Sequence, residues 1–192
     1  MTLKMRPIRR VVTGNDEQGL SGVIYDSYAP NVNIGTIAAS AGMTDIWVYE
    51  KLPAIVDGSR DDGDLPFSFD PPPSGGHLRI VQSASKPLNY DPALDTTAVP
   101  LHAPILRKNG HTWDRGGQNA YSSPVHQSAT IDYGVMLSGK RTLILDDGHR
   151  ELLPGDVVVQ LANWHGWTNP NDTSLMAFIM MGGVAKHKME DL

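Results

Sequence analysis

The sequence contains no cysteine. Disulfide bonds and thiolate metal sites are therefore excluded, so any metal ion would have to be held by histidine, carboxylate, carbonyl or water ligands. For the same reason the sequence carries no indication of the redox compartment.

A basic patch is also missing. The 16 lysines and arginines are outnumbered by 21 aspartates and glutamates, which gives a net charge of −5, and the basic residues are scattered along the chain. This distribution does not build a positive surface for a polyanion. Nucleic acid and anionic membranes are therefore not expected as partners.

Long apolar segments are absent as well. The longest uncharged run, Ser27 to Thr44, is interrupted by proline, asparagine and glycine, whereas a membrane span needs about 20 mostly apolar residues. We expect this run to be a loop. The charged N-terminus, Met1 to Val12, is not followed by the apolar stretch of a secretory signal, so the expected location is cytoplasmic.

Glycine and proline, in contrast, are abundant. The chain has 19 glycines and 14 prolines, is 40% hydrophobic and shows no long segment with a helical period, which predicts many short strands joined by turns. A length of 192 residues fits one domain. We expect N-terminal strands and loops in residues 1–123, the core motifs in 124–182 and a charged tail in 183–192.

The first part of the chain shows strand-like regions separated by turn residues. Ile8 to Asp26 contains two apolar stretches around Asn-Asp-Glu-Gln-Gly, a pattern typical of a hairpin. Alternating apolar and polar residues predict strands over Asp45–Leu52 and His77–Ser83. Between them, Asp57–Gly76 is rich in aspartate, proline and glycine and is expected to be an exposed loop.

No hydrophobic repeat is evident from Lys86 to Ser123, and Leu101–Leu106 is expected to be a short helix or irregular. A connection of this length inside a compact domain is typical of a lid or binding loop, and a surface insertion is the alternative. Four of its residues could fold over the binding site as a lid: His111, Trp113, Gln118 and Tyr121.

The stretch from Pro124 to Asn169 has the clearest pattern and carries a histidine near each end. Turn signals such as Asp146-Asp147-Gly148 recur about every ten residues, which favours a β-sandwich or barrel. The strands predicted here and just beyond are Ile131–Leu137, Arg141–Leu145, Val157–Val159 and Ser174–Met181.

Side chains alternate between the two faces of a strand, so residues of equal parity share a face. Four polar residues have even numbers: His126, Ser128, Thr130 and Asp132. Their apolar neighbours have odd numbers: Ile131, Tyr133, Val135 and Leu137. The polar set lines either a cavity or a solvated outer face.

Residues 124 to 169 resemble the two signature motifs of the cupin superfamily. His126 matches the first histidine of the first motif, and Gly139 matches its glycine. Asp132 stands where that motif has a glutamate, and Ser128 stands where it has a second histidine.

The second motif is matched by Gly155-Asp156 and by His165, with Asn169 four residues later. Leu161-Ala162-Asn163 replaces the Pro-x-Gly turn that usually precedes this histidine. The resemblance implies an all-β fold, the cupin double-stranded β-helix or jelly-roll barrel, with extra N-terminal strands. It also implies a homodimer and a small organic molecule as partner.

The substitutions leave His126, Asp132 and His165 as the candidate catalytic and metal-binding residues. Two histidines and one carboxylate suit a divalent metal such as Fe, Mn, Ni or Zn. Because aspartate reaches less far than glutamate and serine is a poor ligand, the alternative is a metal-free pocket in which these residues act as acids and bases. Further candidate pocket-lining residues are Ser128, Thr130, Met136, Trp167 and Tyr121.

Two classes of function stay open. The first is a small-molecule enzyme, either a metal-dependent oxygenase or isomerase or a metal-independent dehydratase or cyclase. The second is a non-catalytic barrel that binds or senses a small ligand. A serine hydrolase is disfavoured because no nucleophile turn surrounds Ser128. His77 and His102 have no partner in the local sequence and receive no role.

Overall fold

The computed structural model describes residues 4–35, 38–56, 58–106, 112–169 and 173–185, with the backbone alone for 101–106 and 112–116. His111 and the tail beyond residue 185 lie outside the described residues, as do the side chains of His102 and Trp113. Within the described part, no helix is long and apolar enough to cross a membrane.

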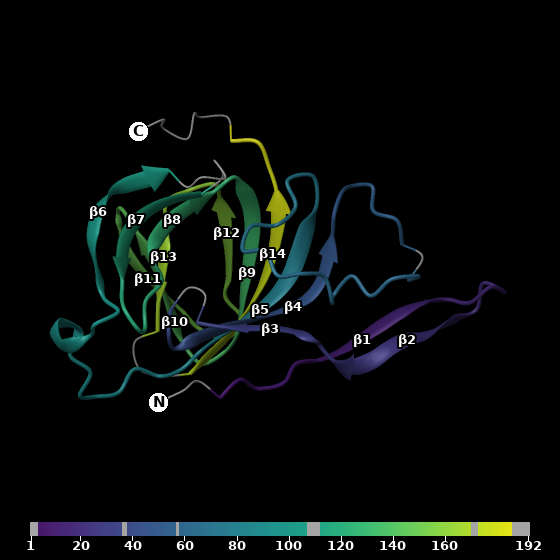
Figure 1. Cartoon of the computed structure of the whole chain (residues 1–192), viewed down its shortest axis with the longest axis horizontal. Coiled ribbons are helices and arrows are strands. Elements are labelled where there is room, and N and C mark those ends of the chain that lie inside the picture. Colours follow the sequence, from purple (N-terminus) through teal and green to yellow (C-terminus); the bar gives the residue numbers. More distant parts are fainter. Residues whose placement is uncertain (1–3, 36–37, 57, 107–111, 170–172, 186–192) are drawn as a thin grey trace.

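One wall of the barrel is a six-stranded antiparallel sheet in the order β12-β9-β14-β5-β4-β3 (Figure 1). Its strands are β3 (Asn31–Ile34), β4 (Ala41–Tyr49), β5 (Gly76–Ser83), β9 (Thr130–Ser138), β12 (Val157–Leu161) and β14 (Ser174–Gly182).

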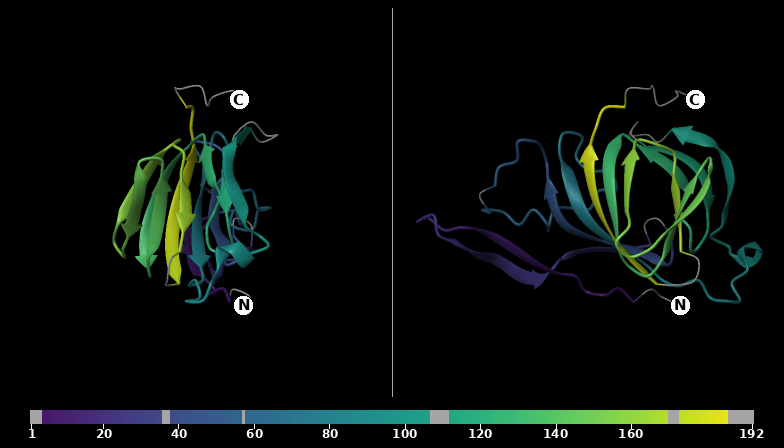
Figure 2. Two further views of the ribbon diagram at one scale, coloured as in Figure 1. Left: turned by 90° about the vertical axis from the view of Figure 1, so that its left-hand side faces the viewer. Right: turned by 180° about the vertical axis from the view of Figure 1, so that it is seen from behind.

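The opposite wall consists of two three-stranded sheets, β6-β7-β8 and β11-β10-β13 (Figure 2). Their strands are β6 (Val99–Leu106), β7 (Thr112–Gln118), β8 (Val125–Ser128), β10 (Arg141–Leu145), β11 (Gly148–Leu152) and β13 (Gly166–Thr168). Isolated bridges between Ser122 and Thr168 and between His126 and His165 join the two sheets. The two candidate histidines therefore lie at the seam of this wall.

The remaining elements lie outside the barrel. Strands β1 (Arg9–Asn15) and β2 (Ser21–Tyr28) form a hairpin that projects away from it, and a short 3-10 turn, η1 (Pro92–Leu94), precedes β6 (Figure 1). The side chain of Asp16 closes the hairpin turn by accepting hydrogen bonds from the backbone N–H groups of Gln18 and Leu20, at 2.9 and 2.8 Å. The predicted hairpin is confirmed.

The interior follows from the alternation of side chains in the central strands. The even-numbered residues are buried from Thr130 to Met136 in β9 and from Ser174 to Met180 in β14, and they contribute Met136, Met176, Phe178 and Met180 to the core. The odd-numbered residues of β9 face outward. The fold predicted from the sequence, an all-β jelly-roll barrel with extra N-terminal strands, is confirmed.

Two predictions about irregular segments were wrong. Leu101–Leu106 is neither a short helix nor irregular, because it belongs to β6 and pairs with β7, so Lys86–Ser123 is not structureless. The run Ser27–Thr44, predicted as a loop, contains β3 and the start of β4. In both places antiparallel pairing with the next strand of the chain stabilises an extended segment that lacks a hydrophobic repeat of its own.

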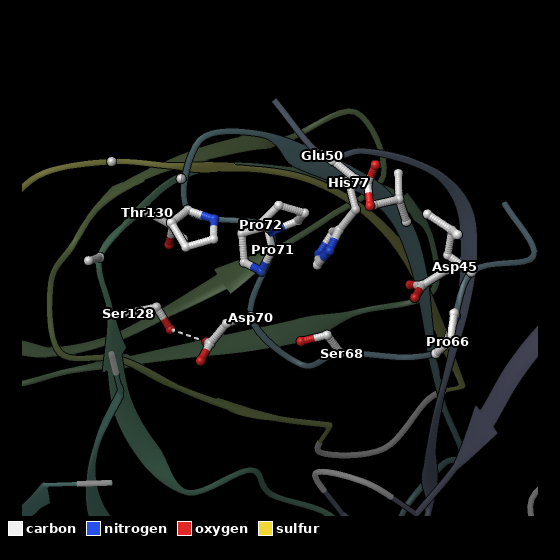
Figure 3. Close-up of a pocket in the computed structure, with 16 residues that line it drawn as sticks. Asp45, Glu50, Pro66, Ser68, Asp70, Pro71, Pro72, His77, Ser128 and Thr130 are labelled. Carbon is white, nitrogen blue, oxygen red and sulfur yellow. Dashed lines mark hydrogen bonds between the residues drawn. The ribbon is translucent and has the colours of Figure 1, made fainter. Parts of the chain in front are cut away.

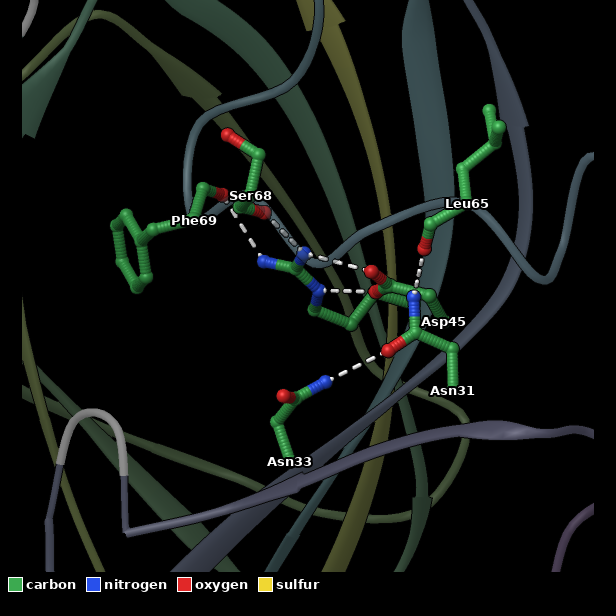
Figure 4. A network of polar contacts seen from close by, with 7 residues as sticks. Asn31, Asn33, Asp45, Leu65, Ser68 and Phe69 are labelled. Atoms are coloured by element: carbon green, nitrogen blue, oxygen red, sulfur yellow. Dashed lines mark hydrogen bonds and ion pairs between the residues drawn. The ribbon is translucent and has the colours of Figure 1, made fainter.

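In the predicted loop, the described residues 58–75 contain no strand, but they are not simply exposed. Phe67 and Phe69 pack against the core. The guanidinium group of Arg79, on β5, donates to the backbone oxygens of Ser68 and Phe69 at 2.6 and 2.9 Å, and Figure 4 shows these contacts. The segment is therefore attached to the inner face of the six-stranded sheet.

The same guanidinium group forms a buried ion pair. Arg79 and Asp45 are cross-strand neighbours on β5 and β4, and the two Arg79–Asp45 hydrogen bonds measure 2.5 and 3.1 Å (Figure 4). Both side chains are almost fully buried, at 2% and 3% exposure. A buried pair of this kind adds little net stability, but removing one partner leaves an uncompensated charge in the interior.

We therefore expect Asp45→Ala to lower the free energy of unfolding by about 3–5 kcal/mol, measured by urea denaturation. Asp26→Ala is the matched control, because Asp26 pairs with Arg9 at 2.7 Å on the exposed hairpin, where ion pairs contribute little. Equal losses in the two variants would contradict the role given to the buried pair.

Candidate functional site

A cavity of about 50 Å³ lies inside the barrel between the two walls. Apolar side chains such as Met43, Val81 and Phe178 form part of its lining. Its polar lining consists of six residues: Arg79, His126, Asp132, Arg141, Gln160 and His165. All three predicted site residues therefore border one cavity.

The two histidines form a rigid pair across the seam. His126 and His165 exchange two backbone hydrogen bonds, of 2.8 and 2.9 Å, and their ring centroids are 4.4 Å apart. The Nδ1 atom of His126 lies 2.8 Å from the carbonyl oxygen of Pro124, and that of His165 lies 3.0 Å from the carbonyl oxygen of Asn163. A carbonyl can only accept, so each Nδ1 carries the proton.

A neutral imidazole that donates from Nδ1 has a lone pair on Nε2. Burial, followed by the charge of the neighbouring His126, lowers the pKa of His165 to about 3, so this ring is neutral at physiological pH. The site therefore offers a Nε2 lone pair from His165, and the backbone contact of His126 fixes the same tautomer in its neutral form.

The turn before His165 explains how the chain tolerates the missing Pro-x-Gly sequence. Ala162 adopts a left-handed conformation, with φ of 52°, which a non-glycine residue adopts at a cost of about 1–2 kcal/mol. Its carbonyl accepts a hydrogen bond from the side chain of Gln127, and its N–H donates to Thr130 at 3.1 Å. These contacts fix the loop that positions His165.

Asp132 faces the cavity from β9. Burial raises the pKa of its carboxyl group to about 6, a hydrogen bond with Thr130 opposes this shift, and the negative charge of Asp70 adds to it. Its Oδ1 atom is buried and has no hydrogen-bond partner, and the same holds for both amide atoms of Gln160, the cross-strand neighbour of Asp132. These atoms are available to a bound molecule.

Arg141 brings a positive charge to the same cavity. Its side chain donates to the hydroxyl of Ser83, lies 5.8 Å from the ring centroid of Trp167 and keeps a buried Nε atom without a partner. Burial lowers its pKa to about 10, so the guanidinium group stays charged at neutral pH. It is placed to stabilise negative charge on a bound molecule.

The remaining predicted residues are spread over several places. Trp167 lines the barrel cavity, whereas Met136 lies in the hydrophobic core, and Tyr121 packs against Tyr90 outside the cavity. Ser128 and Thr130 are buried and line a separate, larger cavity. The even-numbered polar residues thus face inward, as the cavity-lining alternative requires.

The fit of a metal ion to this donor set is partial. The anchored Nδ1 atoms orient both histidines as metal-binding histidines are commonly oriented. Among the described residues, however, no group of three or more His, Asp or Glu is placed to hold one ion. Ser128, at the position of the second motif histidine, instead donates a long hydrogen bond of 3.4 Å to Asp70.

Several site residues were missed by the sequence analysis. Arg79, Arg141 and Gln160 were not singled out, and Phe69 lay in a segment predicted to be an exposed loop. Alternation relates residues only within one strand, so the pairing of Gln160 with Asp132 follows from the register of β12 against β9 and could not be predicted from parity. The sequence did not show which face of β5 points inward, so Arg79 and His77 could not be found.

Comparison with known proteins agrees with the motif resemblance. The chain is 36% identical over 210 residues to phomopsin biosynthesis cluster protein C' of Diaporthe leptostromiformis, covering 98% of this chain and 92% of that protein. It is 48% identical over 48 residues to the cupin-domain-containing oxidoreductase srdD of Neurospora crassa, a match that spans only 24% of each protein.

Among solved structures, a putative ethanolamine utilization protein Q of Salmonella typhimurium covers 93% of this chain and 99% of its own, at 9% identity and a TM-score of 0.42. No protein-family profile matches the chain. From its two motifs and its curated cupin-domain relatives, the chain belongs to the cupin superfamily.

The raised pKa of Asp132 predicts a specific pH dependence of stability. Between the usual pKa of 3.8 and about 6, the folded protein holds a proton that the unfolded chain releases, so this group stabilises the fold at low pH and ceases to do so as the pH rises through 6. We expect Asp132→Asn, which lacks the titration, to gain about 2 kcal/mol relative to wild type between pH 4 and pH 7.

Urea denaturation at a series of pH values measures this difference. The neutral His165 changes the free energy of unfolding with pH in the opposite direction. Because both proteins contain it, its contribution cancels in the difference between them. Asp26→Asn on the exposed hairpin is the control and should show no such trend. A stability difference that is the same at pH 4 and pH 7 would refute the raised pKa.

Proposed function

We propose that the chain is a small-molecule enzyme of the cupin type that transfers protons within the barrel cavity, as in an isomerisation, dehydration or cyclisation. The observation that carries this proposal is the pairing, in one cavity, of a carboxyl group with a pKa of about 6 and a buried histidine pair. A general acid or base works best when its pKa lies near the working pH.

The residues would act as follows on a substrate with a carbonyl group. The Asp132 carboxylate removes a proton from the carbon next to the carbonyl, and the charge that develops on the oxygen is stabilised by Arg141. The Nε2 atom of His165 accepts a hydrogen bond from a hydroxyl or amine group of the substrate. Protonated Asp132 then returns the proton to another carbon or to a leaving oxygen.

The relatives support a role in small-molecule metabolism. Cupin-domain-containing oxidoreductases and proteins of the phomopsin and oryzines biosynthesis clusters are among them. Their names do not specify a substrate for this chain. The cytoplasmic location, the lack of nucleic-acid and membrane partners, and the single domain over residues 1–192 stay predictions.

A divalent metal, Fe, Mn, Ni or Zn, is the second candidate, and the anchoring of both Nδ1 atoms favours it. His126 and His165 would hold the ion, and Asp132 is the carboxylate in the same cavity. A bound metal would supply Lewis acidity or a site for O₂. A barrel that binds a small ligand without turnover is the non-catalytic alternative.

We also propose the homodimer, with the outer face of β9 and β12 as the contact surface. Apolar side chains of both strands are exposed there and lie side by side in the sheet: Ile131, Tyr133, Leu137, Val157, Val159 and Leu161. An apolar surface of this kind on a folded protein is typical of a protein contact.

One experiment separates the two catalytic candidates. Protein purified without chelator is analysed for Fe, Mn, Ni and Zn, and the EDTA-treated protein is incubated in D₂O with a panel of small ketones and aldehydes. We expect the metal-free wild type to catalyse deuterium exchange next to the carbonyl, followed by NMR, and Asp132→Asn to lose about 100-fold or more of that rate.

Asp26→Asn serves as the control for this substitution and should exchange at the wild-type rate. If instead stoichiometric metal is found, is lost in the His126→Ala, His165→Ala double variant, and is needed for turnover, then the metal candidate is correct and proton transfer by the metal-free site is refuted. Saturable ligand binding with no exchange under either condition would favour the non-catalytic alternative.

A further inference from the structure

A second and larger cavity, of about 420 Å³, lies beside the barrel cavity, where β4 ends and β5 and β9 begin (Figure 3). The segment that Arg79 holds against the sheet separates the two. Phe69 lines the barrel cavity, whereas Ser68 and Asp70, its neighbours in the chain, line the outer cavity. None of His126, Asp132 and His165 lines the outer cavity.

The walls of the outer cavity are apolar and stiff. Four prolines line it, Pro66, Pro71, Pro72 and Pro73, together with Val48 and Leu65. Proline has a fixed φ angle, and the wall is also attached at Arg79, so the shape exists before a ligand binds. A preformed apolar cavity of a few hundred Å³ is the usual setting for a small organic molecule.

His77 is the polar group that the fold leaves without a protein partner there. Its side chain is 2% exposed, its Nε2 atom has no hydrogen-bond partner, and its ring points into the cavity near Pro71 and Pro72 (Figure 3). Burial, followed by the charge of Arg79, lowers its pKa to about 3, so the ring is neutral. A bound molecule would satisfy this nitrogen.

The charges around the cavity indicate the sign of the ligand. Its lining residues include Asp45, Glu50 and Asp70 but no lysine or arginine. Asp45 is paired with Arg79, and Glu50 with Arg60 at 3.2 Å. Asp70, which accepts the hydrogen bond from Ser128, lies close enough to Asp132 to raise its pKa. A cation is favoured in such surroundings, and an anion is disfavoured.

We propose that the outer cavity binds a small organic ammonium ion, with its apolar body against the prolines and its ammonium group hydrogen-bonded to Asp70 and His77. This site goes beyond the proton transfer proposed for the barrel cavity and does not depend on it. Because Asp70 lies close enough to Asp132 to raise the pKa of that carboxyl group, a cation bound here would also act on the charge of Asp132.

The test uses the full chain and benzylammonium as the probe, with benzyl alcohol and benzoate as neutral and anionic counterparts of the same size. Isothermal titration calorimetry gives the affinities, and NMR chemical-shift changes locate the site. We expect benzylammonium to bind saturably and about tenfold or more tightly than benzyl alcohol, the ratio that a charge-assisted hydrogen bond provides, and benzoate not to bind.

Asp70→Asn and His77→Leu should each weaken benzylammonium binding by about tenfold. Asp26→Asn, the same change on the exposed hairpin, and His165→Gln in the barrel cavity should leave the affinity unchanged, and circular dichroism checks that each variant is folded. The proposal is overturned if benzylammonium does not bind saturably, if Asp70→Asn binds it as tightly as wild type, or if His165→Gln abolishes binding while Asp70→Asn does not.

The deuterium-exchange assay tests Asp132→Asn, and the benzylammonium titration tests Asp70→Asn and His77→Leu. Each proposal can therefore fail without the other. If the protein exchanges deuterium but does not bind benzylammonium, the proposed reaction is supported and the outer site is refuted. If it binds benzylammonium but does not exchange deuterium, only the outer site is supported.

Discussion

The buried guanidinium group of Arg79 is the contact on which the arrangement of this molecule depends. It joins β4 to β5 through Asp45 and holds the segment of residues 65–73 through the carbonyls of Ser68 and Phe69. Phe69 then packs edge-on against His126, with ring centroids 5.8 Å apart. One cation thus fixes the wall that divides the interior into two cavities.

The chemistry of the barrel cavity follows from where the polar residues lie. Two sheets of the same wall meet at the His126–His165 bridge, and the opposite wall brings Asp132 to the same cavity. Burial disfavours charge, and it therefore raises the pKa of the carboxyl group and lowers that of His165. The result is a neutral His165 beside a carboxyl group that titrates near pH 6, a pair suited to exchanging protons with a bound molecule.

Sequence patterns predicted the parts of this structure that local rules determine. The hairpin, the strands after Pro124 and the shared face of His126, Ser128, Thr130 and Asp132 follow from turn residues and from alternation along a strand, whereas alternation left open whether that face points inward. The prediction that His126, Asp132 and His165 share one site came from the cupin motifs. These predictions needed no knowledge of which strand pairs with which.

The missed features depend on how strands pair. β6 and β3 have no strong pattern of their own, and each is extended because it pairs with the next strand of the chain. Arg79 was not singled out and His77 received no role, because their burial follows from the place of β5 between β4 and β14 in the sheet. The partly buried segment 65–73 depends in turn on Arg79.

At position 128 a serine stands where the cupin motif has its second histidine. Ser128 is directed to Asp70 and the outer cavity, so the donors at the seam are two histidines with a carboxyl group from the opposite wall. The chain keeps the barrel and the positions of the cupin motifs, but its described residues do not assemble three ligands around one point. The histidine pair is consequently the centre of both catalytic candidates.

The protonation of this pair is the central claim, and ¹⁵N NMR of the imidazole rings measures it most directly. Signals of the seven histidines are assigned with His126→Gln and His165→Gln. At pH 7 we expect a protonated Nδ1 on both rings and an unprotonated Nε2 on His165. An unprotonated Nδ1 on either ring, or a charged imidazolium at His165, would contradict this assignment.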